Sequence, residues 1–459
     1  MKCNVYAHAI ILFIFVLSNT PEVKPQSRAI NKCTLLNRSF SAASYKELNI
    51  NNIITYIYNN GFIDNNPDGA KEGLEFPKGT GKTVIYQSGF LWGGKINSEI
   101  RVGGSTYFSG LTPGKILKNG IPENPDNANV RVYRVRRDFK TSDLKSEINA
   151  GEGTYRQIYD NYLRDWNEWP AEDGAPYKDV DRDSTYDPSI DIPGVPGADQ
   201  TIWYAANDLN KDQTQKFAGS LPVGIELQVT VWGYNTAGTL GNTNFRKYRL
   251  VNRSGNEIKD MYLAQWSDVD DGGAVDDLAG CDSARSLGFV YNSSGFDSMY
   301  GSTPPAVGFD IIQGPVIDGS VIDHAIYDNK IIFGKKNLPM TSFVSFSCGD
   351  TVYSMPAFSD YTKGALAWYN FFQGRTGKRG ESFKIPPQLG GGATSFLFNG
   401  DPLEGTGWID GVEQLCGDKN ILLSTGPFNM APGDTQEVVI ANMVGAGKDE
   451  LNGVRILTF

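Results

Sequence analysis

The sequence predicts a mostly β fold, with β-sandwich-like domains and a helical and loop-rich insertion near residues 140–200. Its 52 glycines and 12% aromatic residues favour sheets and turns over helices. Short, strand-like apolar runs recur along the chain between Gly and Pro turns, without a fixed-period repeat. A chain of 459 residues is long enough for two or three domains with a substantial core.

The N-terminus has the layout of a secretory signal peptide. One Lys precedes an apolar run at residues 9–17, and small or polar residues follow it, in MKCNVYAHAIILFIFVLSNT. The run is too short to span a bilayer, and no other stretch is apolar enough to do so. Cys3 precedes the run rather than following it, so we expect no lipid anchor. We therefore expect residues 1–18 to be removed and the protein to be secreted or located at the cell surface.

Three regions follow the signal peptide. Residues 30–140 contain strand-like runs such as KTVIYQSGFLWGGKI and ANVRVYRVRR. Residues 141–200 begin with a helix that breaks near residues 151–153 and continue as an acidic loop. Residues 201–459 again predict sandwich strands, with a hairpin turn at residues 253–256 and one helix in TKGALAWYNFFQG. The last two strands are joined by a Pro-Gly-Asp turn.

Charge and histidine content exclude several classes of function. The net charge of −10 disfavours a nucleic-acid partner and favours cations. Of the two histidines, His8 leaves with the signal peptide and only His324 stays, in a strand-like run where we expect it to be half-buried. Neither HExxH nor CxxC occurs, so a common zinc site is not expected. No GxSxG elbow occurs either, and a Ser-His-Asp triad would depend on His324 alone.

The stretch EFPKGTGKT ends like a nucleotide-binding P-loop. A P-loop needs Gly four residues before its Gly-Lys pair, where this chain has Phe76. It also opens a helix, whereas the β-branched and aromatic run VIYQSGFLWGG follows here. We therefore predict a turn that leads into a strand, and no nucleotide binding.

The stretch DVDRDSTYDPSID resembles an EF-hand calcium loop, which places oxygen ligands at positions 1, 3, 5, 7 and 9. The acid expected at position 12 is replaced by Ile190, and the Gly expected at position 6 by Ser184. An exposed, solvated acidic turn is the alternative to a calcium site. The predicted calcium ligands are Asp179, Asp181, Asp183, Thr185, Asp187 and, as a closing ligand, Asp191.

Two further acidic segments are weaker cation candidates. Asp208, Asn210 and Asp212 repeat the alternating spacing on a shorter scale. Six carboxylates lie within WSDVDDGGAVDDLAGCD, where their repulsion requires either a cation or a very exposed loop. These two explanations of the six carboxylates stay open. The six are Asp268, Asp270, Asp271, Asp276, Asp277 and Asp282.

A catalytic carboxylate pair is the alternative to a binding function. Glycosidases hold two carboxylates across a substrate cleft. Asp165, Glu168 and Glu172 lie beside Trp166 and Trp169, which could stack on sugar rings. Tryptophans in such a Pro-containing loop also commonly fill the edge of a core. A catalytic carboxylate pair is not recognisable from the linear sequence.

Four cysteines remain after removal of the signal peptide, and in an exported protein they could form two disulfides with three possible connectivities. Among these we predict a Cys348–Cys416 bond, because each residue begins a Cys-Gly-Asp turn beside a strand. The four cysteines are Cys33, Cys281, Cys348 and Cys416.

Several long strings together resemble a family of large exported proteins of Bacteroidota and Ignavibacteria-type bacteria, many of which end in a type IX secretion sorting domain. These strings include GLEFPKGTGKTVIYQSGFLWGGKINSEIRVGG, DWNEWPAEDGAPYKDVDRDSTYDPSIDIPGVPGADQTIWYAANDL and MYLAQWSDVDDGGAVDDLAGCDSARSLGFVYN. The resemblance spans residues 45–455 and implies export and an extracellular or surface location, but no catalytic residues. Relatives often have Gly in the acidic loop, where Arg182 and Ser184 stand here. They also continue beyond residue 459, so we expect this chain to be truncated or to lack the anchor.

These observations predict an exported, non-enzymatic protein that acts by binding or as a structural module, with calcium as its cofactor. A glycan or surface polymer is the expected partner class. The alternative is a carbohydrate-active or other hydrolytic enzyme that uses a carboxylate pair.

Overall fold

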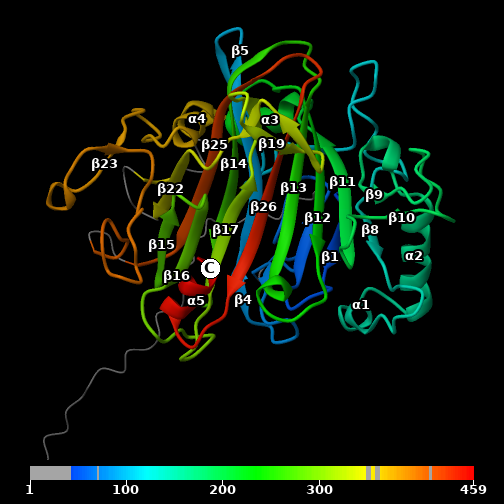
Figure 1. The fold of residues 1–459 in the computed structure, drawn as a ribbon, viewed down its shortest axis with the longest axis horizontal. Helices are drawn as coiled ribbons and strands as arrows, with labels where there is room; N and C mark the ends of the chain where they lie inside the picture. The colour runs from blue at the N-terminus through cyan, green and yellow to red at the C-terminus, as the bar shows by residue number, and fades with distance from the viewer. Residues whose placement is uncertain (1–42, 70–71, 348–352, 357–361, 413–415, 459) are drawn as a thin grey trace, which may run out of the picture. The chain divides into compact units, whose positions relative to one another are not determined.

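A computed structural model describes residues 43–69, 72–347, 353–356, 362–412 and 416–458. The predicted signal peptide lies outside these residues. The described residues belong to one compact unit. The predicted mostly β fold is confirmed, since strands in several sheets far outnumber helices in the described part of the chain (Figure 1).

The largest sheet has nine antiparallel strands. Along the sheet they are β15 (Asp277–Asp282), β16 (Leu287–Asn292), β17 (Ala306–Gln313), β26 (Thr435–Gly445), β13 (Thr243–Asn252), β12 (Ile225–Gly233), β11 (Gln200–Asn207) and β7 (Thr112–Pro113), with β8 (Tyr133–Arg136) also paired to β11. Strands from both predicted β regions therefore share this sheet.

A second sheet has five antiparallel strands, again drawn from both regions. In order they are β22 (Ser342–Ser347), β25 (Lys419–Met430), β14 (Ile258–Val269), β5 (Gln87–Ile96) and β6 (Glu99–Gly104).

Short two-stranded pairs are β1 (Tyr45–Leu48) with β2 (Thr55–Tyr58), β3 (Leu74–Glu75) with β4 (Thr83–Ile85), β9 (Tyr177–Lys178) with β10 (Ile192–Pro193), and β23 (Phe383–Lys384) with β24 (Ala393–Thr394). The α-helices are α1 (Lys145–Asn149), α2 (Tyr155–Asn167), α3 (Lys211–Ala218), α4 (Ala365–Phe372) and α5 (Glu450–Leu457).

The two large sheets share one hydrophobic core and form a sandwich. Buried residues of β5, β14 and β25 belong to the same cluster as those of β12, β13 and β26. Between the sheets, the rings of Phe90 and Tyr248 stack with their centroids 3.9 Å apart. Tyr248 also donates a hydrogen bond to Gln265 of β14 at 3.1 Å. The apolar faces of the strands are therefore buried against each other.

The predicted hairpin at residues 253–256 is wrong. β13 and β14 flank this turn but belong to different sheets, so the turn crosses the sandwich edge. The turn between β25 and β26 crosses in the same way. The buried side chain of Asn252 ties both crossings together, because its Nδ2 donates to the carbonyls of Asn256 at 2.8 Å and of Met430 at 3.1 Å. Turn residues alone do not distinguish a hairpin from such a crossing.

The predicted helices are present. The broken helix of the insertion consists of α1 and α2, and Thr154 caps α2 in a reciprocal capping box with Gln157. The insertion leaves the sheet after β8 and returns at β11, two neighbouring strands. The predicted later helix is α4, which buries Trp368 and Phe372 against the core.

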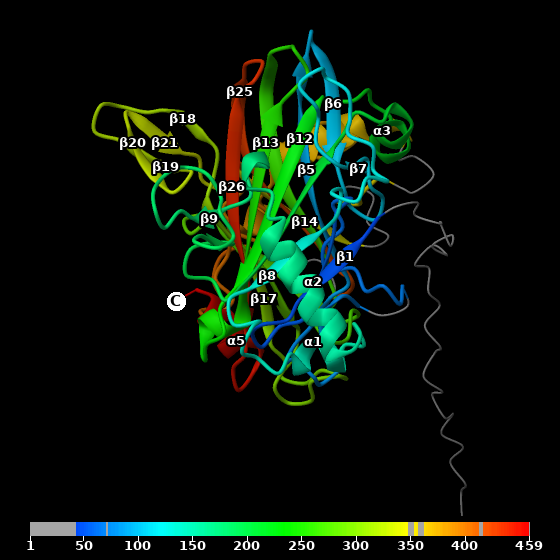
Figure 2. The same cartoon turned by 90° about the vertical axis from the view of Figure 1, so that its right-hand side faces the viewer.

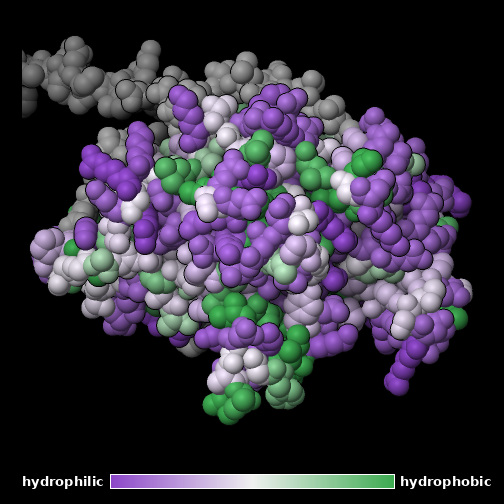
Figure 3. Space-filling view, turned by 90° about the horizontal axis from the view of Figure 1, so that it is seen from above, coloured by the Kyte–Doolittle hydropathy of each residue, from purple (hydrophilic) through white to green (hydrophobic). Residues whose placement is uncertain are grey.

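Residues 316–337 form an arm that projects from the sandwich (Figure 2). The arm pairs β18 (Val316–Asp318) with β21 (Lys335–Asn337), and β19 (His324–Tyr327) with β20 (Lys330–Phe333). Val321, Ile322 and Phe333 are 92%, 85% and 79% exposed, and Figure 3 shows hydrophobic side chains beside polar ones on the arm. His324 is exposed rather than half-buried as expected, because the arm lies outside both large sheets.

Candidate functional site

Residues 179–191, the predicted calcium loop, are closed at their base by a strand pair. Lys178 of β9 lies opposite Ile192 of β10. The loop is also fixed to α2, since the hydroxyl of Tyr186 donates to the backbone carbonyl of Trp166 at 2.6 Å. These contacts give the acidic segment a defined shape.

Three of the six predicted ligands come together in this loop. Carboxylate oxygens of Asp179, Asp181 and Asp183 all lie within 4.8 Å of one another. The carboxylate of Asp179 accepts the N–H of Arg182 at 2.6 Å and that of Ser184 at 2.9 Å. Both of these residues adopt left-handed backbone conformations, with φ of 64° and 65°. Ser184 thus takes the type of conformation that Gly provides most easily at the sixth position of an EF-hand loop.

The other three predicted ligands make different contacts. Asp191 is buried, and its two oxygens accept the N–H groups of Val180 at 2.8 Å and of Asp187 at 2.9 Å. Thr185 donates its N–H to Asp183 at 2.7 Å. Neither Asp187 nor Asp191 belongs to the group of carboxylates within 4.8 Å in the described chain. Asp191 therefore closes the loop through backbone hydrogen bonds.

The charge of this loop favours a cation. The pKa of Asp181 is raised by partial desolvation and by the neighbouring carboxylate of Asp183, which disfavours its charged form. Calcium binds six to eight oxygen ligands in a flexible geometry and accepts carboxylates, backbone carbonyls and water. Three converging carboxylates in an exposed loop suit this chemistry, because water can complete the coordination.

The second acidic segment has structural roles. Asp208 is fully buried and accepts the N–H groups of Gly224 at 2.9 Å and Ile225 at 2.8 Å. Its burial raises its pKa to about 6. Asn210 caps α3 by accepting the N–H of Asp212. These contacts account for the alternating pattern without a cation.

The third acidic segment is not an exposed loop. Asp268, Asp270, Asp271 and Asp277 are all fully buried, which makes that alternative wrong. The carboxylate of Asp268 accepts hydrogen bonds from Tyr107 and from Asn420, both at 2.7 Å. Asp282, at the end of β15, forms an ion pair with Arg285 at 2.5 Å. The buried carboxylates between these two positions need another explanation.

Two of the three candidate catalytic carboxylates, Asp165 and Glu168, are held by one arginine. Arg131 pairs with Asp165 at 3.0 Å and with Glu168 at 2.8 Å. Asp165 also accepts the N–H of Arg134 at 3.0 Å. Trp169 is buried and donates to a backbone carbonyl, as expected for a residue that fills a core edge. These ion pairs fix the insertion to β8 and neutralise the carboxylates.

The P-loop-like stretch is a turn between the paired strands β3 and β4. The predicted turn leading into a strand is therefore confirmed. The ammonium group of Lys82 lies 5.2 Å from the centre of the Tyr300 ring. No helix begins at this turn.

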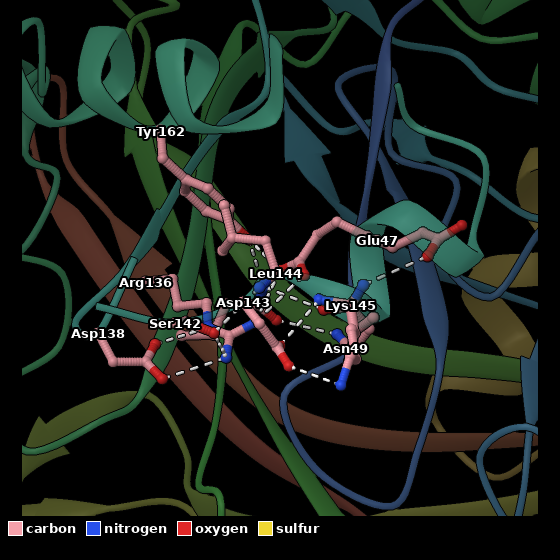
Figure 4. Close-up of polar contacts among 12 residues, drawn as sticks. Glu47, Asn49, Arg136, Asp138, Ser142, Asp143, Leu144, Lys145 and Tyr162 are labelled. Atoms are coloured by element: carbon pink, nitrogen blue, oxygen red, sulfur yellow. Dashed lines mark hydrogen bonds and ion pairs between the residues drawn. The ribbon is translucent and has the colours of Figure 1, made fainter. Parts of the chain in front are cut away.

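A buried polar network fixes the insertion to β8 (Figure 4). Arg136 forms ion pairs with Asp138 at 2.6 Å and with the fully buried Glu147 at 3.1 Å. Tyr162 of α2 donates to Glu147 at 2.7 Å. Burial, followed by repulsion from other carboxylates, raises the pKa of Glu47 to about 7.

The structure does not show the predicted disulfide. Cys416 is exposed with a free thiol, and Cys348 and Cys33 lie outside the described residues. Cys281 is buried, and its thiol donates to the carbonyl of Leu397 at 3.3 Å. The Cys348–Cys416 bond stays a prediction.

No protein-family model matches this chain, and no curated protein matches it in sequence. The resemblance to exported bacterial proteins therefore stays a prediction. Within the described residues, every helix is too short or too polar to cross a membrane.

Proposed function

We propose that this chain is an exported, non-enzymatic β protein of the cell surface or extracellular space, in which calcium stabilises the loop at residues 179–191. The observation that carries the proposal is the convergence of the carboxylates of Asp179, Asp181 and Asp183 within 4.8 Å. Arg182, between Asp181 and Asp183, and Ser184, directly after Asp183, have left-handed backbones that help to turn the chain. The protein would act by binding or as a structural module built on the sandwich.

The alternative, a hydrolytic enzyme with a carboxylate pair, has less support. Asp165 and Glu168 are both engaged by Arg131, which would keep their charges paired. A retaining or inverting glycosidase needs one carboxyl group free to give up a proton and another free to attack or to activate water.

For the partner we propose a glycan or another surface polymer, on the basis of the resemblance to exported surface proteins. The arm at residues 316–337 is a suitable contact surface, because large exposed apolar patches mark interaction sites. Replacing Ile322 and Phe333 with Ser should weaken retention on isolated cell-envelope polymer several-fold without lowering the melting temperature. Equal retention of the variant would exclude the arm as the contact surface.

Thermal unfolding with calcium and with chelator tests the calcium loop. Extracellular sites bind calcium with Kd values of about 10⁻⁴ to 10⁻³ M, and calcium at a hundred times Kd would add about 2.7 kcal/mol to the free energy of unfolding. Asp181→Ala should reduce the rise in melting temperature that calcium causes. The matched variant Asp212→Ala, in the structural segment, should not. An equal rise in wild type and Asp181→Ala would contradict a calcium site in this loop.

A further inference from the structure

The turn between β14 and β15, residues 270–276, joins the two sheets of the sandwich. β14 lies in the five-stranded sheet, and β15 is the edge strand of the nine-stranded sheet. Carboxylates occur along this connection and at both of its ends, in DVDDGGAVDD. This connection is separate from the loop at residues 179–191, which lies in the insertion.

Two buried carboxylates here have three oxygens without a hydrogen-bond partner among the described residues. Asp271 is fully buried, and within the described chain neither of its carboxylate oxygens has a hydrogen-bond partner. Asp277 is also fully buried; its Oδ1 has no partner, and its Oδ2 accepts the N–H of Asp271 at 3.3 Å. Buried polar groups in native proteins are almost always satisfied, so three unmatched oxygens on adjoining side chains require a missing partner.

Neighbouring carboxylates further disfavour the ionised forms of Asp271 and Asp277. The pKa of Asp271 is raised by burial and by the carboxylates of Asp297 and Asp276. Burial, Asp271 and Asp270 raise the pKa of Asp277. None of the ion pairs between described residues gives a Lys or Arg to Asp271 or Asp277. Buried ionised carboxylates persist in proteins only when they are paired or bind a metal.

The backbone of this turn is shaped so that the carboxylate of Asp297 approaches it closely. Asp297 accepts the N–H of Gly273 at 2.8 Å and that of Tyr300 at 2.6 Å, which fixes the turn. Gly272 has φ of 75°, and a β-carbon at this residue would lie 2.3 Å from the carboxylate of Asp297. A β-carbon at Gly273 would likewise lie 3.0 Å from Asp297 and 3.4 Å from Asp276. The two glycines therefore allow a close approach that other residues would block.

We propose that Asp271 and Asp277 bind a buried divalent cation, of the calcium class, at the turn that joins the two sheets. Hard cations with oxygen ligands satisfy several carboxylates at once, and the oxygens need not lie within hydrogen-bond distance of each other. Asp270 and Asp276 are the chain neighbours of the two proposed ligands.

The test is the number of calcium and magnesium ions bound per folded chain, measured by elemental analysis after dialysis against a defined level of each metal. Asp181→Ala disrupts the exposed loop but leaves the buried site intact, so it should retain one ion per chain. Asp271→Asn should lose this ion, and Asp181→Ala with Asp271→Asn should retain none. Samples dialysed against calcium alone and magnesium alone identify the metal; calcium occupancy should exceed magnesium occupancy at least tenfold.

Two results would overturn the proposal. The first is a folded Asp181→Ala protein without a bound divalent cation, and this result does not require the Asp271 variant to fold. The second is a folded Asp271→Asn protein that keeps the same ion count as wild type. An absent calcium site in the loop at residues 179–191 gives a different result. In that case Asp181→Ala would bind as many ions as wild type.

Discussion

At the scale of single residues, some buried ionisable side chains are compensated by an ion pair and others are not. Arg246 and Asp64 are both fully buried and pair at 2.8 Å, so each compensates the other. Glu47 is also buried, but its pKa is raised to about 7 by burial and by Glu152, against an ordinary value of 4.5. Its charged form is therefore disfavoured in the folded protein.

This difference predicts a pH dependence of stability. Because the folded pKa of Glu47 exceeds the unfolded value, its stabilising contribution is full below pH 4.5 and is lost as the pH rises through about 7. Gln does not ionise, so Glu47→Gln removes this loss. The variant's gain in free energy of unfolding over wild type should be larger at pH 8 than at pH 5, by up to about 3 kcal/mol. Urea unfolding at both pH values measures the free energy of unfolding of wild type and variant, and the exposed Glu404→Gln is the control. A pH-independent effect of Glu47→Gln would contradict the raised pKa.

At the scale of elements, the calcium loop depends on its left-handed residues. Ser184 has φ of 65°, a conformation that costs a non-glycine residue free energy. Ser184→Gly should therefore raise the free energy of unfolding in calcium by about 0.5–1 kcal/mol. Ser189→Gly, in the same loop without a left-handed backbone, should lower it. Equal effects of the two substitutions in denaturant unfolding would contradict this account of the loop.

The sequence predicts local elements better than their partners. The spacing of Asp179, Asp181 and Asp183 is sufficient to predict their convergence, because a short turn brings alternate side chains together. Asp297 could not be found in this way. It lies 24 residues from Gly273, whose N–H it accepts, and only the folded sheets bring them together. The sequence around Asn252 predicts a hairpin instead of a crossing for the same reason, because distant strands determine which sheet receives the next strand.

At the scale of the whole molecule, the two sheets are joined by turns that cross the sandwich edge. The side chain of Asn252, 1% exposed, donates to carbonyls of both crossings. Asn252→Ala would leave these buried carbonyls without a donor and should lower the free energy of unfolding by about 1–3 kcal/mol. The exposed Asn235→Ala should change it by less than about 0.5 kcal/mol. Similar losses for both in urea unfolding would exclude this role of Asn252.

The central claim for the whole molecule is that calcium binds the loop at residues 179–191. A crystal structure determined in the presence of calcium tests it most directly. We predict an anomalous peak with oxygens of Asp179, Asp181 and Asp183 about 2.3–2.6 Å away, completed by backbone carbonyl and water oxygens. A fully ordered loop at saturating calcium that contains only water between these carboxylates would contradict the claim.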